Sequence, residues 1–308
     1  MSGQGGLVCD GVGKVYPNGK RALSAIDLVV PTSGIFALIG RNGAGKTTLT
    51  RILSTILEPS SGRATIDGLD VMADAKKLRE RMAVVPQEGR TISWTTPTEM
   101  IRSYLMWRGL GYDESREKAV EAIARVGLEK QADRLNSTLS GGMKRKVLVA
   151  MVIASEAELV FLDEPSTGLD PISRQELWNL LTDLGKTRFL FLTTHYLEEA
   201  EQIADRIGVL NGGALIALGS LPELRGRLMY QYSLKAPKGT VLPSVEGETI
   251  ARRDGQVQIM TTEDQALTIS KSLIEKRAQF SVNPVTLDDI FHYMVARSDA
   301  SGGGRPGQ

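Results

Sequence analysis

The sequence predicts an α/β fold with a mostly parallel sheet, and three features of the 308-residue chain support this. Apolar runs with the composition of buried strands alternate with segments whose apolar residues have helical spacing. One such strand, Gly34–Gly40, leads directly into the glycine-rich segment Gly40–Thr48. Another, Leu159–Leu162, ends in the carboxylates Asp163 and Glu164. Sites in α/β proteins form at the carboxyl ends of such strands, so we expect these polar segments to share one edge of the sheet.

Turn residues and apolar spacing place the elements in order along the chain. The elements expected before Gln87 are two or three short strands in Leu7–Val30 broken at Pro17–Gly19, the strand Gly34–Gly40, a helix over Thr47–Leu57, and strands at Ala64–Asp67 and Met82–Pro86. A helical stretch follows over about residues 88–155. The elements expected after it are strands at Leu159–Leu162 and Phe189–Thr193, a helix with Leu177, Leu180, Leu181 and Leu184 on one face, and a helix over Tyr196–Ala204.

The pattern changes near residue 227, where a small α+β appendage is expected to begin. Its expected elements are strands at Tyr230–Leu234 and Gln256–Met260, a helix at Ala266–Ile274, and a last helix with Leu287, Ile290, Phe291 and Met294 at i, i+3, i+4, i+7 spacing. Thr286 and Asp289 have the spacing of a capping box at the start of that last helix. We therefore divide the chain into a domain at 1–226, an appendage at 227–297 and a glycine-rich tail at 298–308 that we expect to be disordered.

Composition argues against several classes of function. Lysine and arginine number 37 and acidic residues 36, so a net charge of +1 gives no electrostatic footprint for nucleic acid, and we expect no nucleic-acid partner. The single cysteine, Cys9, cannot form an internal disulfide, and the two histidines are too distant to suggest a zinc set. Apolar residues make up 42%, but no run approaches the roughly 20 residues of a membrane helix. Because these runs are too short, a membrane function would need another chain that spans the bilayer. No secretory signal is visible.

Gly40–Thr48 has the spacing of a P-loop. Gly40, Gly43 and Gly45 would let the backbone curl around a phosphate, and the amides at the start of the following helix would supply positive potential. Lys46 would reach the β- and γ-phosphates, and Thr47 would place its hydroxyl on Mg²⁺. The alternative is a chance glycine-rich turn before a helix.

The pair Asp163 and Glu164 suits metal-assisted hydrolysis. Asp163 would bind Mg²⁺, through water, and Glu164 would accept a proton from the attacking water. The alternative is a helix cap or a solvated loop.

Leu139–Met143 reads Leu-Ser-Gly-Gly-Met at the start of a helix with Met143, Val147, Met151 and Ile153 to bury. A serine and two glycines there, at 140–142, can bind an anion. The alternative is an ordinary N-cap.

Taken in this order, Gly40–Thr48, Leu139–Met143 and Leu159–Pro165 resemble the ATP-binding subunits of ABC transporters, over roughly residues 7–225. Pro165–Asp170 is similar to the family's D-loop. The resemblance implies a P-loop NTPase fold of ABC type, in which an antiparallel β subdomain and a helical subdomain accompany the parallel sheet. It also implies ATP hydrolysis with ATP and Mg²⁺ as cofactors.

The resemblance assigns further site residues. Gln87 would contact Mg²⁺ or water, His195 would contact the γ-phosphate, and Tyr16 would stack on adenine. The plainer alternatives are a surface glutamine, a capping or core histidine and a strand tyrosine. The predicted catalytic residues are Lys46, Gln87, Glu164 and His195; the ATP-binding residues are Tyr16, Asn42, Gly43, Ala44, Gly45, Lys46, Thr47, Thr48, Ser140, Gly141, Gly142 and Asp170; and the metal-binding residues are Thr47, Gln87 and Asp163.

The resemblance also implies two partners. The segment 140–142 would face the P-loop of a second nucleotide-binding subunit, and because both half-sites look intact here we expect a homodimer. Met143 departs from the usual glutamine, a position at which the family varies. A transmembrane permease would dock beside the Gln87 loop and the stretch 95–135, which places the chain in the cytoplasm on the inner face of the membrane. Trp94, Trp107 and Met106 are candidates for that contact, although we favour core packing for them.

Three features narrow the subfamily. Ser140 follows Gln87 by only 53 positions, which leaves no room for the coiled coil of DNA-repair or chromosome ABC ATPases. There is one cassette, without internal repeat, whereas translation factors of the family carry two. Asn283–Phe291 resembles the ending of ABC-2-type exporter ATPases, apart from its Asn-Pro-Val prefix, and Thr194–Ala200 is similar too. The alternatives are a cytosolic ABC ATPase without membrane partner, and an importer ATPase with a ligand-sensing tail.

Overall fold

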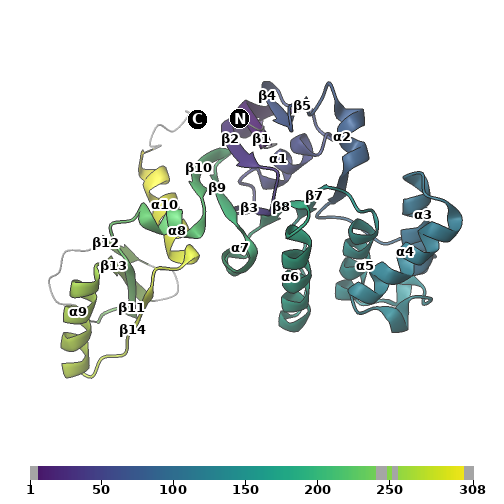
Figure 1. Ribbon diagram of the computed structural model, residues 1–308. Helices are drawn as coiled ribbons and strands as arrows, with labels where there is room; N and C mark the ends of the chain where they lie inside the picture. Colours follow the sequence, from purple (N-terminus) through teal and green to yellow (C-terminus); the bar gives the residue numbers. More distant parts are fainter. Residues whose placement is uncertain (1–5, 241–247, 252–255, 302–308) are drawn as a thin grey trace. The chain divides into compact units, whose positions relative to one another are not determined.

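The computed structural model describes residues 6–240, 248–251 and 256–301 (Figure 1). The chain forms two compact units, Met1–Leu215 and Ile216–Gln308. This division falls eleven residues before the predicted boundary at 226/227. The difference arises because helix α8 (Leu221–Gly226) contacts α10 (Leu287–Ser301). Arg225, on α8, also donates from Nε to the carbonyl of Val285 at 2.8 Å.

The predicted mostly parallel sheet has the strand order β10-β9-β3-β8-β7-β6, and its strands from β9 to β6 lie in the first unit. Its strands are β3 (Ile35–Gly40), β6 (Met82–Val85), β7 (Leu159–Asp163), β8 (Phe189–Thr194), β9 (Arg206–Asn211) and β10 (Ala214–Gly219). The pairs β9–β3, β3–β8, β8–β7 and β7–β6 are all parallel. Because the central strands are covered on both faces, every residue of β3, β7 and β8 is buried. The carboxyl ends of β3 and β7 thus reach the same edge of the sheet.

A second, antiparallel sheet has the order β2-β1-β4-β5. It consists of β1 (Gly6–Val15), β2 (Arg21–Pro31), β4 (Ser61–Ile66) and β5 (Leu69–Asp70), and the chain breaks between the first two at the predicted Pro17–Gly19 turn. Helix α1 (Lys46–Leu53) follows β3 and ends four residues before the predicted Leu57. It ends early because Thr55 turns into the left-handed region, with φ of 64°. The short helix α2 (Ala75–Arg81) precedes β6.

The expected helical segment contains α3 (Pro97–Trp107), α4 (Tyr112–Arg125), the single turns η1 (Glu129–Gln131) and η2 (Asn136–Thr138), and α5 (Gly141–Ala154). The three longer helices lie side by side and contact one another (Figure 1). Helix α3 begins with a capping box between Thr96 and Glu99, with Pro97 at its first turn.

Core packing of Trp94, Trp107 and Met106 was the wrong interpretation. Their exposed fractions are 80%, 92% and 43%. The buried residues of α3 are Pro97, Met100, Ile101 and Leu105. The core face of the helix therefore runs through positions 97, 101 and 105, and Met106 and Trp107 fall beside it on the solvent side.

Helices α6 (Pro171–Gly185) and α7 (Leu197–Ile203) complete the first unit. The second unit has a sheet of order β12-β13-β11-β14, formed by β11 (Tyr232–Pro237), β12 (Glu248–Ala251), β13 (Gln256–Thr261) and β14 (Ser281–Pro284). Helix α9 (Glu263–Glu275) packs Ile269 and Leu273 against Leu234 and Ala236 of β11.

Helix α10 begins as its sequence predicts. Thr286 Oγ1 accepts from the Asp289 amide at 3.3 Å, and Asp289 Oδ2 accepts from the Thr286 amide at 3.0 Å, which forms the capping box. The helix continues to Ser301. The predicted disordered tail is therefore wrong over 298–301, and 302–308 lie outside the described residues.

Candidate functional site

The loop between β3 and α1 needs glycine at its last position. Gly45 has φ of 108°, and a Cβ built there would lie 2.6 Å from the carbonyl oxygen of Ala22. Gly43 has φ of 81° and faces open space, with no atom within 4 Å of a built Cβ. Backbone amides can therefore approach a ligand at Gly43 without a side chain in the way. Lys46 is buried, and its Nζ donates to the carbonyls of Gly40 at 2.9 Å and Arg41 at 3.4 Å.

This loop opens into a pocket of about 380 Å³. The pocket is lined by Tyr16, Lys20, Ala22, Asn42, Gly43, Gly45, Lys46, Thr47, Thr48, Gln87 and Glu164. Tyr16 reaches it from the loop after β1, and its hydroxyl lies 3.2 Å from Oγ1 of Thr48. Ala44 does not line the pocket; it is buried, and its amide donates to Arg41. The structure thus brings together an aromatic ring, a lysine, hydroxyls and a carboxylate around the glycine-rich loop between β3 and α1.

Glu164 lies at the centre of the polar contacts. It follows β7, is 5% exposed, and has its backbone in the left-handed region with φ of 51°. Its Oε1 lies 3.4 Å from Lys46 Nζ, and its Oε2 accepts from Gln87 Nε2 at 3.1 Å and from Thr167 Oγ1 at 3.2 Å. His195 places Nδ1 3.1 Å from the same Oε2, although this nitrogen has no well-aligned hydrogen bond within the described ranges. A carboxylate in this position can receive a proton beside the pocket.

Oxygen atoms suited to magnesium are present beside the pocket. Thr47 Oγ1 donates to Oε1 of Gln87 at 3.5 Å, so two of the predicted metal-binding residues are in contact. The third, Asp163, ends β7 and precedes the lining residue Glu164 without lining the pocket itself, and it accepts a hydrogen bond from the Thr193 hydroxyl. No cluster of three or more histidine, cysteine or acidic side chains could hold a metal in the part of the chain that is described. A set of hydroxyl, amide and carboxylate oxygens fits Mg²⁺, which keeps several waters and takes few protein ligands.

The segment 140–142 and Asp170 do not line this pocket. Ser140 is the N-cap of α5, and its Oγ accepts from the Met143 amide at 3.3 Å. Asp170 is the N-cap of α6 and accepts from the amides of Ile172 and Ser173 at 3.1 and 3.0 Å. Hydrogen bonds from Ser173, first from its side chain and then from its amide, lower the pKa of Asp170. Ser140 and Asp170 are exposed, so both caps remain accessible to a second ligand or chain.

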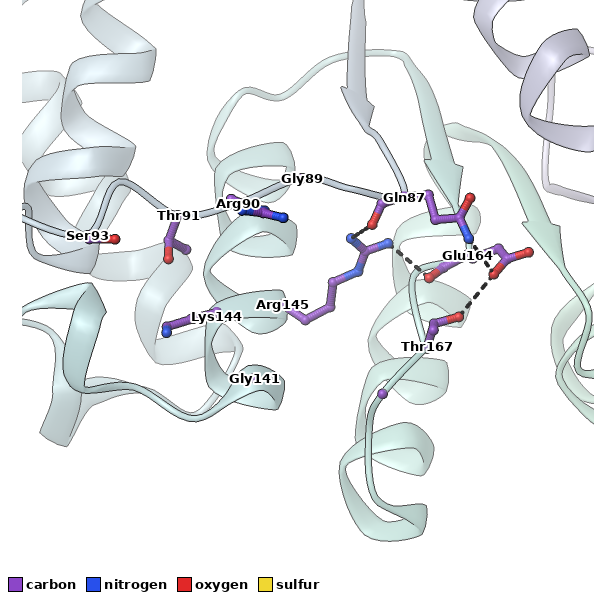
Figure 2. Close-up of a pocket in the computed structure, with 11 residues that line it drawn as sticks. Gln87, Gly89, Arg90, Thr91, Ser93, Gly141, Lys144, Arg145, Glu164 and Thr167 are labelled. Carbon is purple, nitrogen blue, oxygen red and sulfur yellow. Dashed lines mark hydrogen bonds between the residues drawn. The ribbon is translucent and has the colours of Figure 1, made fainter.

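A second pocket, of about 470 Å³, lies between the Gln87 loop, the start of α5 and the turn after β7 (Figure 2). It is lined by Gln87, Gly89, Arg90, Thr91, Ser93, Gly141, Lys144, Arg145, Glu164, Thr167 and Gly168. Gln87 and Glu164 belong to both pockets. Arg145 was not predicted as a site residue. The sequence shows it only as one basic residue in Lys144–Lys146, whereas the fold buries it and leaves Met143, expected in the core, half-buried.

Residues 23–167 match the protein family described as ABC transporter. The chain is 37% identical over 299 residues to the daunorubicin/doxorubicin resistance ATP-binding protein of Streptomyces peucetius, with 91% of this chain and 89% of that protein covered. It is 35% identical over 254 residues to ABC transporter A family member 10 of Arabidopsis thaliana, with 80% of this chain covered but only 27% of that protein. Among solved structures, cbiO1 of Clostridium perfringens, part of the ABC transporter complex cbiONQ, is 29% identical with a TM-score of 0.64, over 71% of this chain and 90% of cbiO1.

Proposed function

This chain belongs to the ATP-binding proteins of ABC transporters, and we propose that it is the ATP-hydrolysing motor of an ABC-2-type exporter whose membrane-spanning part is a separate chain. The proposal rests above all on Glu164, a buried carboxylate at the edge of a P-loop pocket with Lys46, Gln87 and His195 around it. Such a carboxylate is the group that hydrolysis requires next to the terminal phosphate.

The P-loop pocket holds ATP. The amides after Gly43 and the N-terminus of α1 bind the phosphates, Lys46 turns from the Gly40 carbonyl to the β- and γ-phosphates, and Tyr16 stacks on the base. Thr47, Gln87 and Asp163 would hold Mg²⁺, which would neutralise phosphate charge when bound.

Hydrolysis depends on proton transfer and on positioning. As the water oxygen bonds to the γ-phosphorus and the bond to the β-phosphate oxygen breaks to release ADP, the carboxylate of Glu164 accepts a proton from the water. Gln87 and Thr167 already donate to Oε2 of this carboxylate in this structure. Gln87 orients that water, and His195 donates to the γ-phosphate. Most of the acceleration comes from holding these groups in line with the phosphate.

Two copies of the chain enclose two ATP molecules. Ser140, Gly141 and Gly142 cap α5 outside the P-loop pocket, so the phosphate they bind belongs to a second subunit, and Asp170 lies at the contact between the copies. Loss of the γ-phosphate removes these contacts and lets the two copies separate.

The membrane partner binds beside the Gln87 loop. No helix of the described residues is long and apolar enough to cross a bilayer. Trp94, which follows the pocket residue Ser93, and Trp107, the last residue of α3, expose large apolar surfaces that suit a helix of another chain. We place the chain beside this partner at the cytoplasmic face of the membrane, and the drug-resistance name of the Streptomyces peucetius relative supports an exporter.

Glu164→Gln tests this proposal, and Glu158→Gln is a matched control because Glu158 precedes β7 and its side chain is 65% exposed. We expect Glu164→Gln to lower ATP turnover by about 10²- to 10⁴-fold and to form an ATP-dependent dimer, whereas Glu158→Gln behaves as wild type. Turnover is measured by phosphate release, and the dimer by size-exclusion chromatography with light scattering in Mg-ATP. Wild-type turnover in Glu164→Gln would refute the role of Glu164. A Glu164→Gln protein that stays monomeric in Mg-ATP would refute the two-copy arrangement.

A further inference from the structure

Arg145 is the most buried charged side chain of α5, and it is not one of the proposed catalytic groups. It lies five positions after Ser140 and is 7% exposed. Burial lowers the pKa of its guanidinium, which reflects the cost of placing a charge in this environment. A buried cation persists only where hydrogen bonds replace its lost water.

Those hydrogen bonds all go to backbone carbonyls. Nε donates to Pro165 at 3.0 Å, Nη1 to Pro86 at 3.2 Å and Gln87 at 3.5 Å, and Nη2 to Asp163 at 2.8 Å and Glu164 at 2.9 Å. The five contacts match the five N–H donors of a guanidinium. Figure 2 shows the side chain reaching from α5 toward Gln87 and Glu164. One side chain thus joins the Gln87 loop, the turn after β7 and the helix that Ser140 caps.

The contact with Glu164 bears on an unusual backbone conformation. A non-glycine residue at φ of 51° keeps that conformation only where its surroundings hold it. The Glu164 amide donates to the carbonyl of Thr193 at 3.1 Å, and its own carbonyl accepts from Arg145. Arg145 therefore holds one side of the residue and Thr193 the other.

We propose that Arg145 is a positioning residue that fixes the carboxylate of Glu164 and the amide of Gln87 relative to each other and to the helix capped by Ser140. This inference rests on the proposed function, since it concerns the same site. Arg145 also links the start of α5 to the catalytic groups of the same copy. A nucleotide bound at 140–142 of one copy would therefore change the positions of Glu164 and Gln87 in that copy. The rigid fork of arginine is needed, because a lysine ammonium has only three N–H donors and cannot reach five carbonyls.

The test uses Arg145→Lys and Arg145→Gln, which keep three and two N–H donors. Arg188→Lys is the matched control, because Arg188 is half-buried and donates to carbonyls at the other end of α5, those of Val152 and Ile153, at 3.3 Å. We measure kcat, the Kd of Mg-ATP by fluorescent nucleotide titration, and the thermal midpoint of the full chain. We expect both Arg145 variants to lower kcat by about 10- to 100-fold with Kd within about threefold, since a small displacement of a catalytic group has effects of this size. Arg188→Lys should keep wild-type kcat and Kd.

Wild-type kcat in either folded Arg145 variant would overturn the inference. So would a parallel loss of kcat, affinity and thermal midpoint, because that pattern marks a purely structural role. Glu164→Gln separates this result from failure of the proposed function. If Glu164→Gln lowers turnover as expected while Arg145→Lys keeps wild-type kcat, only the positioning role fails; if Glu164→Gln retains wild-type turnover, the proposed function itself fails. In the Glu164→Gln background, Arg145→Lys should have no further effect on kcat if it acts through Glu164.

Discussion

Replacement of Asp289 by alanine should destabilise the second unit much more than replacement of its neighbour Asp288. The side chain of Asp289 is 1% exposed, and Oδ1 accepts from Gln258 Nε2 at 2.7 Å and lies 3.1 Å from Lys235 Nζ. The Asp288 side chain is 38% exposed, and its Oδ1 lies 3.5 Å from His292 Nε2. The two acids are adjacent in sequence but differ completely in environment.

The magnitude follows from the contacts that are lost. Gln258 is fully buried, and the loss of a charged acceptor for its amide costs about 1.5–3 kcal/mol. The loss of the capping box with Thr286 costs about 1 kcal/mol more. Lys235 is a quarter exposed and can turn to water, so its ion pair adds less than about 1 kcal/mol. We therefore expect Asp289→Ala to lower local stability by about 3 kcal/mol, and Asp288→Ala by less than about 1 kcal/mol.

Hydrogen exchange in the intact chain measures this difference. A loss of about 3 kcal/mol raises the population of the open state, and so the exchange rate of protected amides in 256–261 and 287–295, by about 100-fold. Asp289→Asn keeps the side-chain volume and one acceptor oxygen, and should fall between wild type and Asp289→Ala. Equal exchange rates in Asp289→Ala and Asp288→Ala would refute the role of the buried network.

Two further predictions concern the first unit. Gly45→Ala should lower the stability of the nucleotide-free chain by about 1–3 kcal/mol more than Gly43→Ala, because only at Gly45 does a Cβ meet a backbone atom; equal thermal midpoints would contradict this. Burial, and then the charge of Asp27, raise the pKa of Cys9 from 9.0 to about 12, so the native thiol should resist iodoacetamide at pH 9 and react quickly in urea. Because the folded-state pKa is the higher one, the contribution of Cys9 to stability is complete below pH 9 and is lost as the pH rises toward 12. Cys9→Ala should remove that part of the fall in unfolding free energy at alkaline pH, as urea titrations at several pH values would show. An unchanged fall between pH 9 and pH 12 would argue against it.

The sequence by itself determined the parallel sheet and the P-loop pocket. Buried strands have apolar runs, and a tight turn around phosphate needs glycine. Local residue types therefore predict both the strands of the sheet and the P-loop. Parallel strands then bring Gly40–Thr48 and the pair Asp163 and Glu164 to one edge, whatever the rest of the chain does. The capping box of α10 was likewise predictable, because its two residues are three positions apart.

Local pattern was a weaker guide to which side chains are enclosed. The sequence predicted a helical stretch over about residues 88–155 but not which face of α3 is buried, so Trp107 was expected in the core and lies in solvent. The acids Asp288 and Asp289 read alike in the sequence, and only the position of Gln258 on β13 decides which of them is buried. The unit boundary was also misplaced, because α8 packs with the appendage that follows it.

Arg145 shows most clearly why local pattern does not predict which side chains are enclosed. Its carbonyl partners lie 59 positions away at Pro86 and 18 positions away at Asp163. Only the tertiary fold brings those carbonyls to one point, and without them a buried guanidinium would be unstable. The sequence thus determined which groups can perform the chemistry, through backbone conformation and periodicity, whereas long-range packing decided which charged side chain holds them in place.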